Sequence, residues 1–189
     1  MVNRDLKLLD AVNQKNSELA LELIKAGEEV NQADEIGITP LHQAGKFAMI
    51  EVVNQLIAAG ADVNSANRDG VTPLIWAAAR AKPQSFEILL ENGANMGAID
   101  CDGWSPLHWA AYRGCLPIVE IYIRQKFYLN KPDTDGWTPL HLAAQQGYAE
   151  VVQALLDAGV DRSLQNDSGQ TAADLATLQK RDGVLAILL

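Results

Sequence analysis

The sequence predicts an all-α protein built as a solenoid of stacked helix-turn-helix units with projecting β-hairpin loops. One observation is a set of glycines that stand 33 residues apart: Gly37, Gly70, Gly103, Gly136 and Gly169. A second is a helix-start signal that follows four of these glycines. A third is a run of apolar residues at helical spacing later in each period. A fixed period of this length indicates repeats that bury their apolar faces only by stacking on one another.

The period divides the chain into six repeats within one expected domain, 1–189. The expected boundaries are 1–33, 34–66, 67–99, 100–132, 133–165 and 166–189. The first repeat lacks the helix-start signal and surrounds Leu6, Leu8 and Leu9 with charged residues, so we expect a cap with one solvated face. The last repeat is shortened and is expected to cap the other end. Its apolar end at Leu189 favours truncation of a longer chain.

Each internal repeat begins with the same short signal for a first helix. In repeat 34–66 it is Thr39 followed by Pro40. The hydroxyl can cap the first turn, and proline suits the first helical position because its missing N–H would be unpaired there. The same pair recurs as Thr72-Pro73, Ser105-Pro106 and Thr138-Pro139. The short helices that follow are rich in alanine, which lets neighbouring helices approach closely.

A second helix follows in each repeat and is expected to end at a glycine in the left-handed conformation. These glycines are Gly27, Gly60, Gly93 and Gly159. Asp-Gly pairs such as Asp69-Gly70 then predict tight turns at the tips of short hairpins. Repeat 100–132 departs from the pattern, because Lys126 occupies the glycine position. A non-glycine residue there costs about 1 kcal/mol, so we expect irregular structure in this repeat.

Composition excludes several classes of protein. The chain has 189 residues, a net charge of −9 and 48% hydrophobic residues, which is too hydrophobic for a disordered chain. It has neither an apolar run long enough to span a membrane nor a secretory signal, and its acidic charge disfavours nucleic acids. Cys101 and Cys115 are its two cysteines, as expected in a reducing compartment. We therefore expect a cytoplasmic protein.

The sequence offers no constellation for catalysis, a metal or a cofactor. His42, His108 and His141 occupy the same position in three different repeats. Stacked helices of neighbouring repeats lie roughly 10 Å apart, so these side chains start far from one another. Zinc ligands must converge to about 2 Å from the ion, so these histidines are not expected to share a metal. Neither cysteine has a histidine beside it in the sequence pattern as an activating base. We expect no enzymatic activity and no cofactor.

Together these motifs resemble those of ankyrin repeats over the whole chain. The resemblance rests on strings such as Gly136-Trp137-Thr138-Pro139-Leu140-His141 and Ala158-Gly159-Val160-Asp161. It implies that the histidines are structural and bond to the threonine hydroxyl and nearby backbone. It also implies that the hairpin tips and the exposed sides of the first helices line a concave face that binds proteins.

Positions with no structural duty in the repeat are the candidates for partner binding. Trp104 and Trp137 occupy the same position one period apart, so we expect them side by side, next to Tyr112 and Arg113. Trp, Tyr and Arg dominate interface hot spots. The full candidate set is Trp104, Trp137, Tyr112, Arg113, Arg80, Asp102, Asp135, Val71 and Phe47. Trp76 and Trp109 share a different position, where packing is the preferred interpretation.

Charge suggests the kind of partner. Lys46, Arg80 and Arg113 fall on first helices of an acidic protein, which indicates that the partner is an acidic or mixed-charge peptide or protein. We also expect the protein itself to be a monomer. The alternative is that Asp102 and Asp135, with Asp69, pair with the arginines and merely neutralise them. That question stays open at the level of the sequence.

Two other functions are compatible with the same sequence. The chain could be the targeting or scaffolding part of a larger protein whose activity lies beyond residue 189. It could also be a substrate of an ankyrin asparaginyl hydroxylase, because the segments that contain Asn31 and Asn64 resemble such sites. For these two asparagines, hydrogen bonding within the hairpin loops is the preferred interpretation.

Overall fold

The computed structural model describes residues 7–189, and these residues form helices joined by turns, with no strand. They divide into two compact units, one up to Ala98 and one from Ile99 to Leu189. The helices of the first unit are α1 (Lys7–Asn13), α2 (Ser17–Lys25), α3 (Pro40–Phe47), α4 (Ile50–Ala58), α5 (Pro73–Ala79) and α6 (Pro83–Glu91). Those of the second are α7 (Pro106–Arg113), α8 (Leu116–Gln125), α9 (Pro139–Gln146), α10 (Ala149–Asp157), α11 (Ala172–Leu178) and α12 (Asp182–Leu188).

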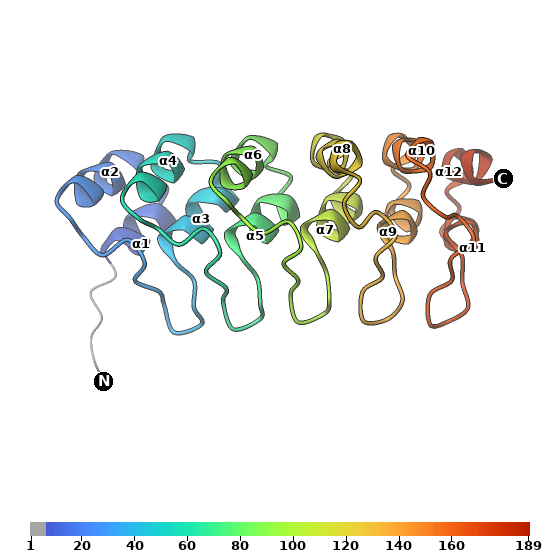
Figure 1. Ribbon diagram of the computed structural model, residues 1–189, viewed down its shortest axis with the longest axis horizontal. Helices are drawn as coiled ribbons and strands as arrows, with labels where there is room; N and C mark the ends of the chain where they lie inside the picture. The colour runs from blue at the N-terminus through green and yellow to red at the C-terminus, as the bar shows by residue number, and fades with distance from the viewer. Residues whose placement is uncertain (1–6) are drawn as a thin grey trace. The chain divides into compact units, whose positions relative to one another are not determined.

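Each of the six predicted repeats contains one pair of helices. Within the first unit the odd-numbered helices α1, α3 and α5 stack in one layer and α2, α4 and α6 in the other (Figure 1). The second unit repeats this arrangement with α7, α9 and α11 against α8, α10 and α12. Buried aliphatic side chains such as Val53 and Leu56 fill the space between the layers, and the small Ala77 and Ala78 of α5 are fully buried. The all-α solenoid of helix pairs is therefore confirmed.

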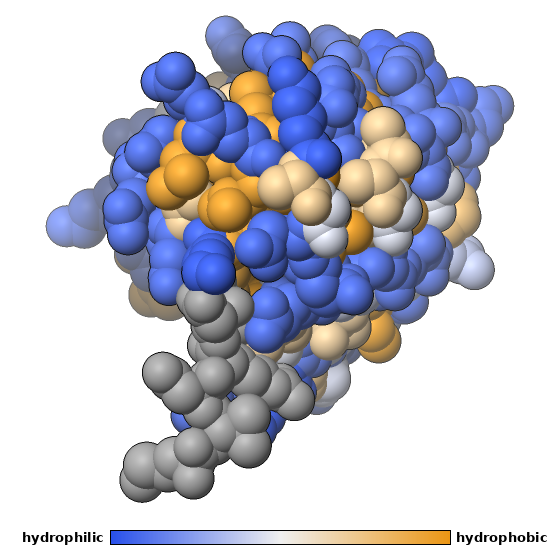
Figure 2. Space-filling model, turned by 90° about the vertical axis from the view of Figure 1, so that its left-hand side faces the viewer, coloured by the Kyte–Doolittle hydropathy of each residue, from blue (hydrophilic) through white to orange (hydrophobic). Residues whose placement is uncertain are grey.

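The predicted N-terminal cap is described in part, because Arg4, Asp5 and Leu6 lie outside the described residues. Within α1, Leu8 and Leu9 are buried while Asp10 is exposed, as an amphipathic cap requires. Figure 2 looks at the end of the first unit that α1 and α2 form, where hydrophilic residues surround a smaller hydrophobic area. In α2, Leu19 is 39% exposed, so this end also presents apolar surface.

The predicted N-caps are present, and a histidine extends three of them. The Thr39 hydroxyl accepts a hydrogen bond from the backbone of His42, and the Nδ1 atom of His42 accepts from the Thr39 backbone N–H at 3.2 Å. This arrangement closes a reciprocal capping box at the start of α3. Nδ1 is an acceptor in this box, so Nε2 carries the proton and donates to the Val71 carbonyl of the next repeat at 3.0 Å. The imidazole thus links two repeats.

The other two histidines make the same link in the second unit. His108 closes a capping box with Ser105, and its Nε2 lies 3.2 Å from the carbonyl oxygen of Trp137. The Nε2 of His141 lies 3.0 Å from the carbonyl oxygen of Leu164 and 3.1 Å from that of Gln170. All three imidazoles are buried and occupied at both nitrogens, which agrees with their interpretation as structural residues.

Asparagines provide a second side-chain link between repeats. Asn64 donates from Nδ2 to the Gly93 carbonyl at 3.1 Å and accepts from the Asn95 backbone N–H at 2.8 Å. Asn31 makes the equivalent pair of bonds one repeat earlier. Both asparagines thus form hydrogen bonds, but these bonds join successive repeats and do not lie within one hairpin loop. Repeat 67–99, which ends the first unit, has Ile75 and Gly97 at the histidine and asparagine positions, and neither side chain can hydrogen-bond.

The projecting loops follow a hairpin path without forming strands. In the loop before α5, the Asn67 backbone N–H donates to the Val71 carbonyl and the Gly70 N–H to the Asn67 carbonyl, both at 3.0 Å. The Asn67 side-chain oxygen also accepts from the backbone of Asp69 and Val71. An Asx side chain at the base thus closes a three-residue turn, and no ladder extends beyond it. The expected tight turn is therefore present, but the short strands of a hairpin are not.

The break in the glycine series has the expected consequence. Gly27, Gly60, Gly93 and Gly159 follow their helices at φ between 82° and 89°, whereas Lys126 adopts a φ of 49°. Tyr128, two residues later, also has a φ of 49°. Left-handed backbone costs a non-glycine residue roughly 1–2 kcal/mol. The predicted irregular structure of repeat 100–132 is therefore confirmed at its second helix end.

A second series of left-handed residues connects the two helices of each repeat. Its members are Lys15, Ala48, Ala81, Gly114, Gly147 and Lys180. Only two of them are glycines, so the sequence did not reveal this series. At Ala48 the backbone N–H bonds to the carbonyls of Ala44 and Gly45, which satisfies the end of α3.

Replacing Lys126 with glycine is expected to stabilise the protein by about 0.5–1 kcal/mol, because relief of the left-handed strain exceeds the entropy lost by a flexible residue. Denaturant unfolding monitored by circular dichroism measures the difference. Arg124→Gly, at an exposed position within α8, is the matched control and is expected to destabilise by about 1 kcal/mol. A Lys126→Gly protein that is less stable than the parent would contradict this account.

Protonation of His108 is expected to weaken the fold as the pH falls. Burial lowers its pKa from 6.5 to about 4. Between these values the unfolded chain binds a proton that the folded chain excludes, so stability decreases from pH 6.5 downward by up to about 1.4 kcal/mol per pH unit. Between pH 7 and pH 5.5, the unfolding free energy of the parent should fall about 1 kcal/mol more than that of His108→Gln. Parallel pH profiles for the two proteins would refute this role.

Candidate functional site

An aromatic pocket lies in the second unit, on the side formed by the hairpin loops and first helices. Its volume is about 590 Å³. Its lining, which defines the aromatic pocket here, is Asp102, Trp104, Trp109, Tyr112, Arg113, Asp133, Asp135, Trp137, Leu142 and Gln145. The loops before α7 and α9 supply two of the tryptophans and the carboxylates, and α7 and α9 supply the rest. The pocket thus gathers three tryptophans and a tyrosine, all of them half-buried.

Three of the rings pack on one another at inclined angles. The ring centroid of Trp104 lies 4.6 Å from that of Trp109 and 5.3 Å from that of Tyr112. Trp109 and Tyr112 meet nearly edge to face, with centroids 6.2 Å apart and planes at 87°. Trp137 instead packs against the imidazole of His141, with centroids 6.2 Å apart. The tilted rings fit one another as aromatic pairs prefer, and their half-exposed surfaces face the pocket.

Carboxylates of the loops hold two of the indoles in place. The Nε1–H of Trp104 donates to Asp133 at 2.7 Å, and the Nε1–H of Trp109 donates to Asp100 at 2.8 Å. The other oxygen of Asp133 accepts from the backbone N–H groups of Asp135 and Trp137. Charge-assisted hydrogen bonds of this kind are the stronger ones, so the indoles are oriented before any ligand arrives.

The structure brings together six of the nine residues predicted to bind a partner. They are Trp104, Trp137, Tyr112, Arg113, Asp102 and Asp135. Trp104 and Trp137 both line this pocket, and their rings pack on different neighbours, Trp109 and His141. Trp109, interpreted as a packing residue, also lines the pocket. Its spacing of three residues from Tyr112 on one helix was the signal that could have placed it there.

The other three predicted residues belong to the first unit. Phe47 and Arg80 line a second pocket of about 370 Å³ together with Lys15, Lys46 and Lys82, and we call this the basic pocket. Val71 lines neither pocket and is half-buried, and its carbonyl accepts the bond from His42.

Cations surround aromatic rings in the basic pocket. The Nζ atom of Lys46 lies 5.2 Å from the ring centroid of Phe47 and 4.6 Å from that of Trp76. The Nζ of Lys15 lies 4.8 Å from the Phe47 centroid. Burial, with the charge of nearby Arg80, lowers the pKa of the Lys46 ammonium. The pocket is therefore cationic, and its one ring, that of Phe47, already lies next to two of its ammonium groups.

Within residues 7–189, the arginines of the two pockets do not pair with the loop aspartates that could neutralise them. Arg113 forms an ion pair with neither Asp102 nor Asp135, and Arg80 forms none with Asp69. The Arg113 guanidinium lies instead over the Tyr112 ring, 5.6 Å from its centroid. Asp102 and Asp135 are both exposed, so their charges stay accessible at the aromatic pocket.

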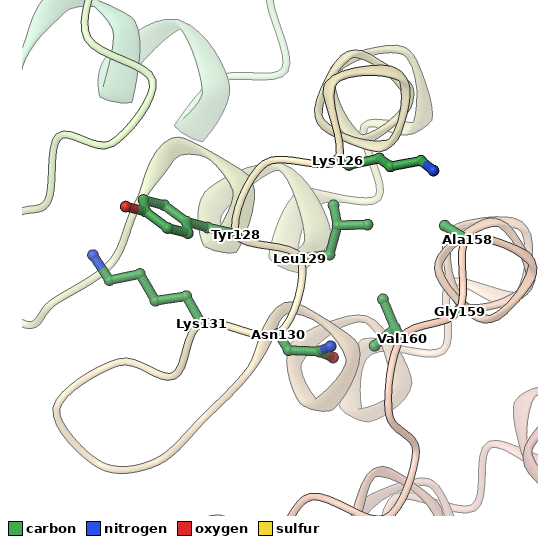
Figure 3. A pocket seen from close by; sticks show the side chains of 8 residues that line it. All are labelled: Lys126, Tyr128, Leu129, Asn130, Lys131, Ala158, Gly159 and Val160. Carbon is green, nitrogen blue, oxygen red and sulfur yellow. The ribbon is translucent and has the colours of Figure 1, made fainter.

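A third pocket follows the irregular end of α8. Its volume is about 650 Å³, and the turn from Lys126 to Lys131 lines it opposite Ala158, Gly159 and Val160 (Figure 3). Leu129 and Val160 face one another across it, whereas the side chain of Lys126 points away from that of Tyr128. Leu129 and Val160 offer apolar surface, and Lys126, Tyr128 and Lys131 are the ionisable residues of the lining.

Among residues 7–189, no three His, Cys, Asp or Glu side chains come together as a metal ion would require. Burial raises the pKa of the Cys115 thiol, which disfavours the nucleophilic thiolate. Of the helices in this part of the chain, none is long and apolar enough to cross a membrane.

Comparison with known proteins agrees with the repeat architecture. The family model described as ankyrin repeats (3 copies) matches residues 8–100, 43–130, 78–166 and 107–189, which together extend over nearly the whole chain. A search of curated proteins finds no match. Ankyrin repeats are generally protein–protein interaction modules. The period, the capping boxes, the stacked helix pairs and the family match lead to one conclusion: the chain belongs to the ankyrin repeat family.

Proposed function

We propose that this protein is a non-enzymatic interaction module that binds a partner protein or peptide through the aromatic pocket of its second unit. The observation that carries the proposal is the gathering of three tryptophans and a tyrosine around one accessible cavity. Structure alone needs no such cluster, because repeat 67–99 has Val71 and Ala79 at the positions of Trp104 and Tyr112, beside a single tryptophan.

The composition of the pocket supports binding. Trp, Tyr and Arg are the residues on which interface affinity most often depends, and all three types line this cavity. The hydrogen bonds from Trp104 to Asp133 and from Trp109 to Asp100 keep the rings oriented in the absence of a ligand. Little conformational entropy is then lost on binding, which favours affinity.

The charges favour a mixed-charge partner over a purely acidic one. Three aspartates and one arginine line the aromatic pocket, whereas three lysines and one arginine line the basic pocket. Complementary charge on the partner would therefore be positive at the first site and negative at the second. The basic residues that suggested an acidic partner in the sequence are thus divided between two sites of opposite charge.

The histidines support a function without catalysis. His42, His108 and His141 use both ring nitrogens in hydrogen bonds of the scaffold. Burial lowers the pKa of each of them, so each stays neutral at physiological pH. None is available as the base that would activate a nucleophile.

Removing the two loop tryptophans is expected to abolish partner capture. With the purified protein as bait in lysate of its native cell, Trp104→Ala with Trp137→Ala should lose partners that the parent retains, because a hot-spot residue contributes about 2 kcal/mol or more. Tyr128→Ala removes an exposed aromatic ring of the same unit outside the pocket and should keep them. Circular dichroism melting curves must show that both variants stay folded. Unchanged capture by the folded double variant would rule out the aromatic pocket as the binding site.

A further inference from the structure

We propose that the aromatic pocket receives a cationic side chain, lysine or arginine, of the partner polypeptide. This inference rests on the proposed function of the same pocket and adds the chemistry of its ligand. It follows from two independent features of the lining: an excess of negative charge and a set of aromatic rings that keep part of their surface exposed.

The charge of the pocket favours a cation. Asp102, Asp133 and Asp135 contribute three carboxylates against the single guanidinium of Arg113. Within residues 7–189, the Asp102 and Asp135 side chains have no hydrogen-bond or ion-pair partner, and both residues are exposed. Their charges are therefore available to a ligand. The carboxylate of Asp133 is partly engaged, since it holds the Trp104 indole and two backbone N–H groups.

The rings favour the same kind of ligand. A cation is attracted to the face of an aromatic ring within about 6 Å of its centroid, and tryptophan is the best such ring. Trp104, Trp109 and Trp137 line the pocket together with Tyr112, and each keeps part of its surface exposed. The guanidinium of Arg113, 5.6 Å from the Tyr112 centroid, already shows one cation at a ring of this pocket.

Other side chains fit the pocket less well. A glutamate or aspartate of the partner would face three carboxylates, which repel it. An uncharged aliphatic side chain could contact the rings but would cover the carboxylates without a compensating interaction. A lysine or arginine satisfies both features, because its apolar stem packs on the rings while its charged end meets Asp102 and Asp135.

The repeat supplies matched controls for each charged position. Asp69 and Arg80 occupy, one period earlier, the positions of Asp102 and Arg113. They belong to the first unit and are not among the residues that line the aromatic pocket. Asp69→Asn and Arg80→Gln therefore change the same charge in the same structural context without touching the proposed site.

The test is a titration of the full chain, labelled with ¹⁵N, followed by the indole N–H signals. The probes are acetylated and amidated Gly-Ser-X-Ser-Gly peptides in which X is lysine, arginine, norleucine or glutamate. We expect the lysine and arginine peptides to shift the signals of Trp104, Trp109 and Trp137 but not that of Trp76 in the first unit. The norleucine peptide should bind at least about fivefold more weakly than the lysine peptide, and the glutamate peptide should leave the signals unchanged.

Variants locate the effect. Asp102→Asn with Asp135→Asn should weaken binding of the lysine peptide about fivefold, and Arg113→Gln should strengthen it, because a competing cation is removed. Asp69→Asn and Arg80→Gln should leave it unchanged. Equal binding of the norleucine and lysine peptides would overturn the inference. So would binding of the glutamate peptide, or the absence of any shift with both cationic peptides.

The two proposals can fail separately. If the folded Trp104→Ala, Trp137→Ala protein still captures its partners, the aromatic pocket is not the partner site and the proposed function fails. If that variant loses its partners while the norleucine peptide binds as well as the lysine peptide, the pocket remains the partner site and only the preference for a cation is overturned.

Discussion

The histidine hydrogen bonds that join one repeat to the next are the interaction on which the architecture depends most. A repeat of two short helices cannot bury its apolar face alone, so neighbours must be held in register. His42 and its equivalents do this with one ring, because Nδ1 caps their own helix while Nε2 reaches the following loop. Asn31 and Asn64 add a second link at the opposite side of the loop.

The separation between structural positions and variable surface positions explains how the binding function can differ while the scaffold stays constant. Positions that cap, link or fill the core are occupied by the same few residue types in most repeats, although repeat 67–99 has Ile75 and Gly97 at the two linking positions. At the loop tips, links between repeats use backbone groups such as the Asp102 carbonyl, so the side chains there can differ from one repeat to the next. Trp104 and Trp137 occupy a loop position that Val71 occupies in repeat 67–99. A cavity lined by rings and carboxylates arises where two such repeats are adjacent.

The sequence was sufficient for the helix pairs, the caps and most of the aromatic pocket, because each depends on a local pattern with a fixed period. It was not sufficient where geometry joins residues of different patterns. Trp104 and Trp109 occupy different positions within the repeat, so the period does not relate them, yet their ring centroids lie 4.6 Å apart. Ala48 gave no sign of its left-handed backbone, because alanine rarely adopts it. The sequence predicts hairpins in the loops, but an Asx side chain such as that of Asn67 closes each turn and no strand hydrogen bonds follow within residues 7–189.

The central claim is that partner recognition is concentrated at the aromatic pocket of the second unit. Once a natural partner has been isolated, mapping its binding on the ¹⁵N-labelled chain by chemical-shift changes tests that claim most directly. The account predicts that the largest changes fall on the indole of Trp104 and on the backbone of the loops before α7 and α9. Changes confined to the other layer of helices, α8, α10 and α12, with an unaltered Trp104 indole signal, would contradict it.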